Sequence, residues 1–147
     1  HQHVQAFEFE PDFADISPYF KKVLTLHILH LLTRRFAEGR TPLTAVQIAR
    51  QLDIPIELVR RILKTLMKAG LISHVCDSED DAPAVQPSSD IHDWTLTYVT
   101  DRLEQRGVNQ IPVAQTTTLS AIEDALQKLN DARKSSPANR LLKDLPD

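Results

Sequence analysis

Hydrophobic and polar residues recur with helical periodicity along much of the chain, most clearly between Thr44 and Val75. Apolar positions repeat at spacings of three and four over 45–52 and again over 56–69. Pro55 separates the two runs, because proline disfavours helical geometry at the residue before it. Gly70 stands where a left-handed helix end needs no Cβ, and residues 71–75 alternate as a half-buried strand does. The pattern predicts a helix-turn-helix over 44–69, with Thr44 as its N-cap, followed by a wing over 71–87.

Further helical runs flank this unit. Ser17 and Pro18 combine a capping hydroxyl with a proline at the first helical position, and Gly39 ends the run that they start. We expect its apolar face to form the main wall of the core, through Phe20, Val23, Leu24, Ile28, Leu31, Leu32 and Phe36. A helix is predicted from about Trp94 to Arg106, and another in which Ser120 and Glu123 are spaced as a capping box.

The expected fold is therefore mainly α with a small β-wing: a winged helix-turn-helix with a long N-terminal helix and a C-terminal helical extension. We divide the chain into a lead segment over 1–16, a winged-helix domain over 17–107, and a connector with C-terminal helices over 108–147. The last long helix carries an apolar stripe that could lie on the winged helix or against a second copy of the chain. The pattern leaves both open for Leu119, Ile122, Leu126 and Leu129, which are candidates for self-association.

Composition narrows the functional classes. The formal net charge of −3 disfavours binding to phosphate backbones, although a local basic patch could still bind them. The single cysteine, Cys76, excludes an internal disulfide framework. His27 and His30 have the spacing of two metal ligands, but no cysteine or carboxylate is placed by the sequence to join them. We predict no catalytic residue, no cofactor and no metal, and the sequence indicates no small-molecule ligand.

The outer faces of the two central helices carry the candidate contact residues. They are polar or basic, and they could meet nucleic acid or a protein partner: Gln47, Arg50, Gln51, Arg60, Arg61, Lys64 and Lys68. An acidic run over 77–81 is predicted at the tip of the wing. Carboxylates there would oppose docking on DNA, since each pair of like charges at 4 Å costs about 1 kcal/mol even in water.

Several segments in their order resemble the C-terminal region of the YihY/BrkB family of inner-membrane proteins, once labelled ribonuclease BN. They are ISPYFKKVLTLHILHLL, LTAVQIARQLDIPIELVRRILKTLMKAGLISHV, VQPSSDIHDWTLTYVTDRLEQRG and SSPANRLLKDL. The resemblance implies a domain on the cytoplasmic side of the inner membrane, attached to a transmembrane helix ahead of His1. Lys21, Lys22, Arg34 and Arg35 would then suit the positive-inside rule.

The central segment also resembles winged-helix repressors of iron-sulfur and cysteine metabolism, which carry a similar helix-turn-helix, wing and following helix. In those repressors the wing region supplies three cysteines to a cluster. Cys76 alone does not support such a cluster here.

Three functions follow as hypotheses. The first is an accessory domain of a membrane protein, acting through a protein partner or a homodimer, with DNA disfavoured. The alternative is a DNA-binding transcriptional regulator that uses the 55–69 helix. The third is a nuclease, which the residues do not support, because phosphodiester hydrolysis usually needs clustered carboxylates around metals or a placed histidine pair.

Overall fold

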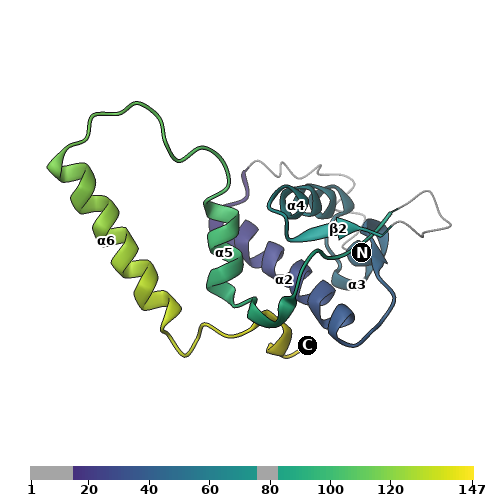
Figure 1. Ribbon diagram of the computed structural model, residues 1–147. Coiled ribbons are helices and arrows are strands. Elements are labelled where there is room, and N and C mark those ends of the chain that lie inside the picture. Colours follow the sequence, from purple (N-terminus) through teal and green to yellow (C-terminus); the bar gives the residue numbers. More distant parts are fainter. Residues whose placement is uncertain (1–14, 76–82) are drawn as a thin grey trace.

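The computed structural model describes residues 15–75 and 83–147, and its elements follow one another as Figure 1 shows. The α-helices are α2 (Pro18–Ala37), α3 (Ala45–Leu52), α4 (Ile56–Lys68), α5 (Leu96–Glu104) and α6 (Thr117–Lys134). The strands are β1 (Leu43–Thr44), β2 (Ile72–His74) and β3 (Ala84–Pro87), and two short 3-10 helices are η2 (Ile91–Asp93) and η3 (Leu142–Asp144). Most of the lead segment, Cys76 and the acidic run over 77–81 lie outside the described residues.

The helix-turn-helix forms where the sequence predicts it. The side chain of Thr44 accepts the Gln47 N–H, and the Gln47 side chain accepts the Thr44 N–H in return, which completes a capping box at the start of α3. Asp53 ends α3 in the left-handed conformation, with φ of 53°. Pro55 then starts α4. The two helices pack through Ile48, Val59 and other buried side chains of one core.

The wing is a three-stranded antiparallel sheet with the order β1-β3-β2. Leu43 of β1 pairs with Val85 of β3, and His74 of β2 pairs with Val85 from the other side. The central strand β3 is thus the returning strand expected near Val85. The two-residue strand β1, which joins the sheet from the N-terminal side of α3, was not expected. Together these elements confirm a mainly helical winged helix-turn-helix with a small β-wing.

Helix α2 forms one wall of the core, and the predicted face is correct only in part. Ile28 and Leu32 are buried as expected, and Leu24 and Leu31 pack against the core, but Phe20, Val23 and Phe36 are 50%, 39% and 46% exposed. The other buried positions, Thr25, Leu29, Thr33 and Arg35, were not predicted. The apolar positions of this helix nearly encircle it, so periodicity alone did not select the buried face.

Two basic residues of α2 do not lie on an open outer face. Arg35 is buried, which lowers the pKa of its guanidinium, and its Nε and Nη2 donate to the Thr41 carbonyl at 2.9 and 2.6 Å. Arg34 is half-buried and donates to the Lys143 carbonyl at 3.2 Å and to Asp147 at 3.1 Å. These two side chains stabilise loops of the domain, so their interpretation as positive-inside anchors is wrong.

After α5 the chain runs away from the winged-helix core through a connector and α6, and it returns to the core at η3. Helix α6 lies at one side of the domain, at the far end of a long connector that follows α5 (Figure 1), and polar contacts of its C-terminal half reach back to α5. It begins at Thr117 with Thr116 as its N-cap, so the capping box expected at Ser120 and Glu123 is wrong. After α6 the chain comes back beneath α5, where Leu142 is fully buried in the core and its N–H donates to the Trp94 carbonyl at 2.8 Å.

Candidate nucleic-acid interface

One face of α4 is buried and the opposite face is open and basic. Leu58, Val59, Ile62, Leu63 and Leu66 are buried and fix the rotation of the helix about its axis. Because the other face then points away from the core, all four basic residues expected there are exposed: Arg60, Arg61, Lys64 and Lys68. From Glu57 to Lys68 this face is about 17 Å long, at about 1.5 Å per residue.

Glu57 is an acidic residue on this basic face that the sequence analysis did not single out. It lies in the first turn of α4, and its Oε1 accepts from Arg60 Nη1 at 3.2 Å. Both side chains are more than half exposed, so this ion pair contributes little to the stability of the fold. Its spacing of three residues was the signal that could have predicted it.

The candidate residues of α3 lie beside this face. Arg50 and Gln51 are exposed in its last turns. Gln47 is exposed as well, but its side-chain oxygen already caps the backbone of Thr44. The structure therefore gives Gln47 a structural role, and its amide nitrogen is the part left for contact with a partner.

The C-terminal end of α4 is held by α5, an interaction that the sequence analysis missed. Arg102 Nη2 donates to the Ala69 carbonyl at 2.7 Å, and the Arg102 guanidinium lies 5.9 Å from the ring centroid of Tyr98. Gly70 follows with φ of +74°, and a Cβ added there would lie 3.0 Å from Arg102 Nη2. The helix that carries the basic face is thus fixed at both ends, by Pro55 and by Arg102. A lone arginine 33 residues after Ala69 gives no sequence signal of this contact.

Helix α6 carries the other candidate set. None of its residues is buried; Ile122, Leu126 and Leu129 are 51%, 60% and 63% exposed, and Leu119 is half-buried. The four side chains share one stripe, as predicted, and Leu119, Leu126 and Leu129 line an open groove of about 1140 Å³ between α6, the connector and α5. The stripe does not lie on the winged helix within the part of the chain that the structure describes.

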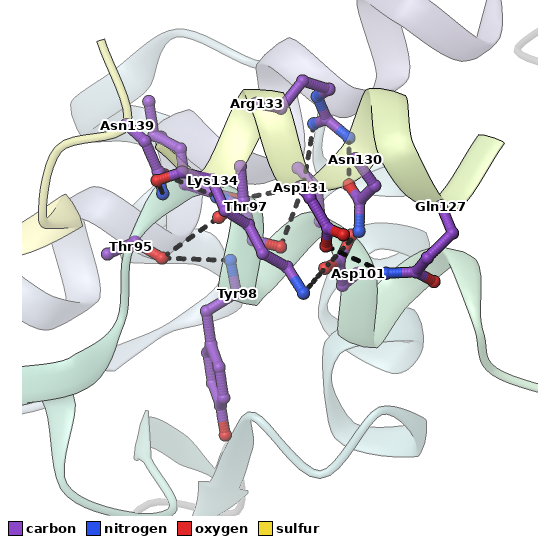
Figure 2. A network of polar contacts seen from close by, with 12 residues as sticks. Thr95, Thr97, Tyr98, Asp101, Gln127, Asn130, Asp131, Arg133, Lys134 and Asn139 are labelled. Atoms are coloured by element: carbon purple, nitrogen blue, oxygen red, sulfur yellow. Dashed lines mark hydrogen bonds and ion pairs between the residues drawn. The ribbon is translucent and has the colours of Figure 1, made fainter. Parts of the chain in front are cut away.

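Polar contacts, rather than apolar packing, join α6 to α5. Figure 2 shows Asn130, Arg133 and Lys134 of α6 facing α5, where Asp101 accepts from Asn130 at 3.2 Å and pairs with Lys134 at 3.7 Å. Arg133 Nη2 donates to Thr100 Oγ1 at 3.5 Å. These contacts hold the C-terminal half of α6 and leave the stripe open.

Residues 25–75 match the model of the IclR helix-turn-helix domain. This range runs from α2 to the end of β2. A search of curated proteins found no match. Among solved structures the chain is similar to IscR of T. potens, with 15% identity, a TM-score of 0.52, and 80% of this chain and 78% of that chain covered.

Two further similar structures are of CymR proteins. CymR, the global cysteine regulator of B. subtilis, has 18% identity and a TM-score of 0.57 over 88% of this chain and 94% of its own. The oxidized form of Staphylococcus aureus CymR has 19% identity and a TM-score of 0.57 over 90% and 98%. At such identities the likeness shows the fold, a winged helix-turn-helix with the C-terminal extension included.

These findings overturn the resemblance to the YihY/BrkB membrane proteins. The segments on which it rested are those of a winged helix-turn-helix, and the matches lead to the IclR helix-turn-helix model and to regulators. Three expectations that rested on this resemblance are therefore wrong: the role as an accessory domain, the attachment to a membrane, and the view that DNA contact is disfavoured. Across the described residues no helix combines the length and apolar character that crossing a bilayer requires.

Two of the similar structures are described as a putative transcriptional regulator from Listeria innocua and as the global cysteine regulator of B. subtilis. The second resemblance, of the central segment to winged-helix repressors, leads to the same group of structures as IscR and CymR.

Proposed function

We propose that this chain is a DNA-binding transcriptional regulator that inserts α4 into the major groove. The observation that carries the proposal is the open basic face of α4, opposite the residues that bury it in the core. A major groove about 12 Å wide admits an α-helix, and residues in the N-terminal half of such a helix reach base edges. The regulators IscR and CymR, with which the chain shares its fold, support this assignment.

In this arrangement the residues divide their roles by position. Arg60 and Arg61 lie in the N-terminal half of α4, where a guanidinium can contact guanine O6 and N7 in the bidentate manner. Lys64 and Lys68 lie further along and contact phosphates. Arg50 and Gln51 contact the backbone beside the groove, and the Gln47 amide can join them.

Affinity across a salt series tests this function. The wild-type chain should bind duplex DNA, with an affinity that falls linearly in the logarithm of salt by about 0.9 per phosphate contact. Arg60→Ala combined with Arg61→Ala should weaken binding by about tenfold or more, at about 1 to 3 kcal/mol for each base contact. Lys128→Ala, an exposed lysine on the far face of α6, is the matched control. Absence of binding, or equal losses in both variants, would refute the proposal.

The regulator acts as a homodimer, with the α6 stripe of one copy seated in the groove beside α6 of the other. Three leucines of the stripe already line that groove, and its other walls add exposed Ile111 and Val113 of the connector. With a two-fold axis between the copies, the stripe of each copy lies in the groove of the other. Apolar side chains that are half or more exposed along a whole helix then become buried at the interface.

Molar mass in solution tests the dimer. Leu126→Glu should convert a dimer to a monomer, because it places a carboxylate in the apolar contact. Lys128→Glu places a carboxylate on the opposite side of the same helix, with an even larger change in net charge, and should leave the mass unchanged. A wild-type chain that is monomeric at micromolar concentration, or dissociation by Lys128→Glu alone, would contradict this arrangement.

A further inference from the structure

A second concave site lies along α5 next to the groove that receives the α6 stripe, and Asp101 and Gln105 line both. This cleft has a volume of about 780 Å³ and is formed by the end of α4, one face of α5 and the C-terminal end of α6. Pockets that bind small molecules usually have about 300–1,000 Å³. The site does not include the α4 face assigned to DNA, except at Lys68, where the two surfaces meet.

The charge of the cleft is positive although the chain is acidic overall. Four basic side chains line it against two carboxylates: Lys68, Arg102, Arg106 and Lys134 against Asp93 and Asp101. Asp101 is already engaged by Asn130 and Lys134. Among the described residues, Lys68 and Arg106 have no carboxylate within ion-pair distance, so two cations at the mouth of the cleft are available to an incoming anion.

The remaining lining offers an apolar surface and hydrogen-bonding groups. The Tyr98 ring is 37% exposed and projects from α5 on the side away from α6 (Figure 2). Thr95 brings a hydroxyl to the same cleft, whereas the amide of Asn139, which also lines it, is already bonded to the Thr97 N–H and the Lys134 carbonyl. An aromatic face beside two cations without ion-pair partners suits a small organic anion.

We propose that this cleft binds a small organic anion carrying a carboxylate or phosphate group. The anionic group lies between Lys68 and Arg106, and the body of the molecule rests on Tyr98. The occupied cleft would alter the hold of α5 on α4, because Arg102, which bonds the Ala69 carbonyl, lies in the same wall. Such a ligand would act as an effector of DNA binding; this regulatory part rests on the proposed function, whereas the binding itself does not.

Calorimetric titration of the full chain with citrate, inorganic pyrophosphate and adenosine monophosphate tests the site at about 150 mM salt. We expect saturable binding of at least one probe, one per chain, with a Kd below about 1 mM. Arg106→Gln should weaken that binding about tenfold or more, since a charge-assisted hydrogen bond is lost. Lys128→Gln, which removes an equal charge from α6 outside the cleft, should leave the Kd unchanged. No saturable binding of any probe, or equal weakening by both variants, would overturn the proposal.

A parallel DNA titration separates this site from the proposed function. Saturable probe binding that is lost in Arg106→Gln supports the cleft even if the chain fails to bind DNA. A shift in DNA affinity with the bound probe, absent in matched potassium chloride, supports its role as an effector site. Arg106→Gln that weakens DNA binding while no probe binds would instead identify the cleft as a contact for backbone phosphates, and would overturn the proposal of a small ligand.

Discussion

Leu142 should be one of the most sensitive positions of the fold, although only five residues of this sequence follow it. It is fully buried, and the segment around it is fixed to the body by backbone hydrogen bonds. Leu142 N–H donates to the Trp94 carbonyl at 2.8 Å, and Leu96 N–H donates to the Arg140 carbonyl at 3.0 Å. His30 Nε2 lies 2.9 Å from the Leu145 carbonyl oxygen. Leu142→Ala therefore removes a core side chain from a segment that is held in place.

The size of the effect follows from burial and from this fixation. Leucine-to-alanine changes in cores cost about 2–5 kcal/mol, and the cost exceeds the low end of this range where the surroundings do not collapse into the cavity. The hydrogen bonds on both sides of Leu142 restrict such collapse. We expect a loss of about 3 kcal/mol, a large fraction of the 5–15 kcal/mol typical of a domain, so that the variant still folds at low denaturant.

Urea unfolding at one fixed protein concentration measures this loss. With a slope of about 1–3 kcal/mol per molar, the midpoint should fall by about 1–3 M while the slope stays the same. Val108→Ala, at a connector valine that is 81% exposed, should change the stability by less than about 0.5 kcal/mol. A loss below about 1 kcal/mol for Leu142→Ala would refute the view that the C-terminal segment is part of the core.

Three further predictions concern the local structure. Thr44→Ala should lower the stability by about 1 kcal/mol in urea unfolding, because it removes the acceptor of the α3 capping box. Gly70→Ala should cost about 1–2 kcal/mol by the same measurement, since alanine is strained at φ of +74° and its Cβ would crowd Arg102. Hydrogen bonds from the backbone and the side chain of His92 lower the pKa of the Asp90 carboxyl group. The ionised carboxylate should therefore stabilise the fold at neutral pH, and this stabilisation should be lost as pH falls through the lowered pKa. A carbon-detected NMR titration in which Asp90 titrates at the ordinary aspartate value would contradict this.

The sequence was most informative where local chemistry decides the structure. The Ser17 cap, the turn at Asp53 and the left-handed Gly70 all follow from residue types whose backbone preferences act over a few positions. The exposure of the α4 basic residues could be predicted for the same reason, because a strong apolar stripe fixes the opposite face.

Long-range features were beyond this reasoning. Nothing local shows that Arg102 holds the end of α4, that Leu142 returns to the core, or that β1 pairs with β3. The family resemblance failed for a related reason: its short segments carry the periodicity of a winged helix-turn-helix, which many proteins of different function share.

The return of the chain after α6 means that this helix is attached to the body at both of its ends. A helix at the end of a free tail could move with a neighbouring copy without disturbing its own domain. Here the connector attaches α6 to α5, and the C-terminal segment attaches it to Trp94 and to α2. A displacement of α6 by another molecule is therefore limited from two separate places, by the connector at α5 and by the C-terminal segment at Trp94 and α2. The connector, α6 and the C-terminal segment together form a closed loop on the domain.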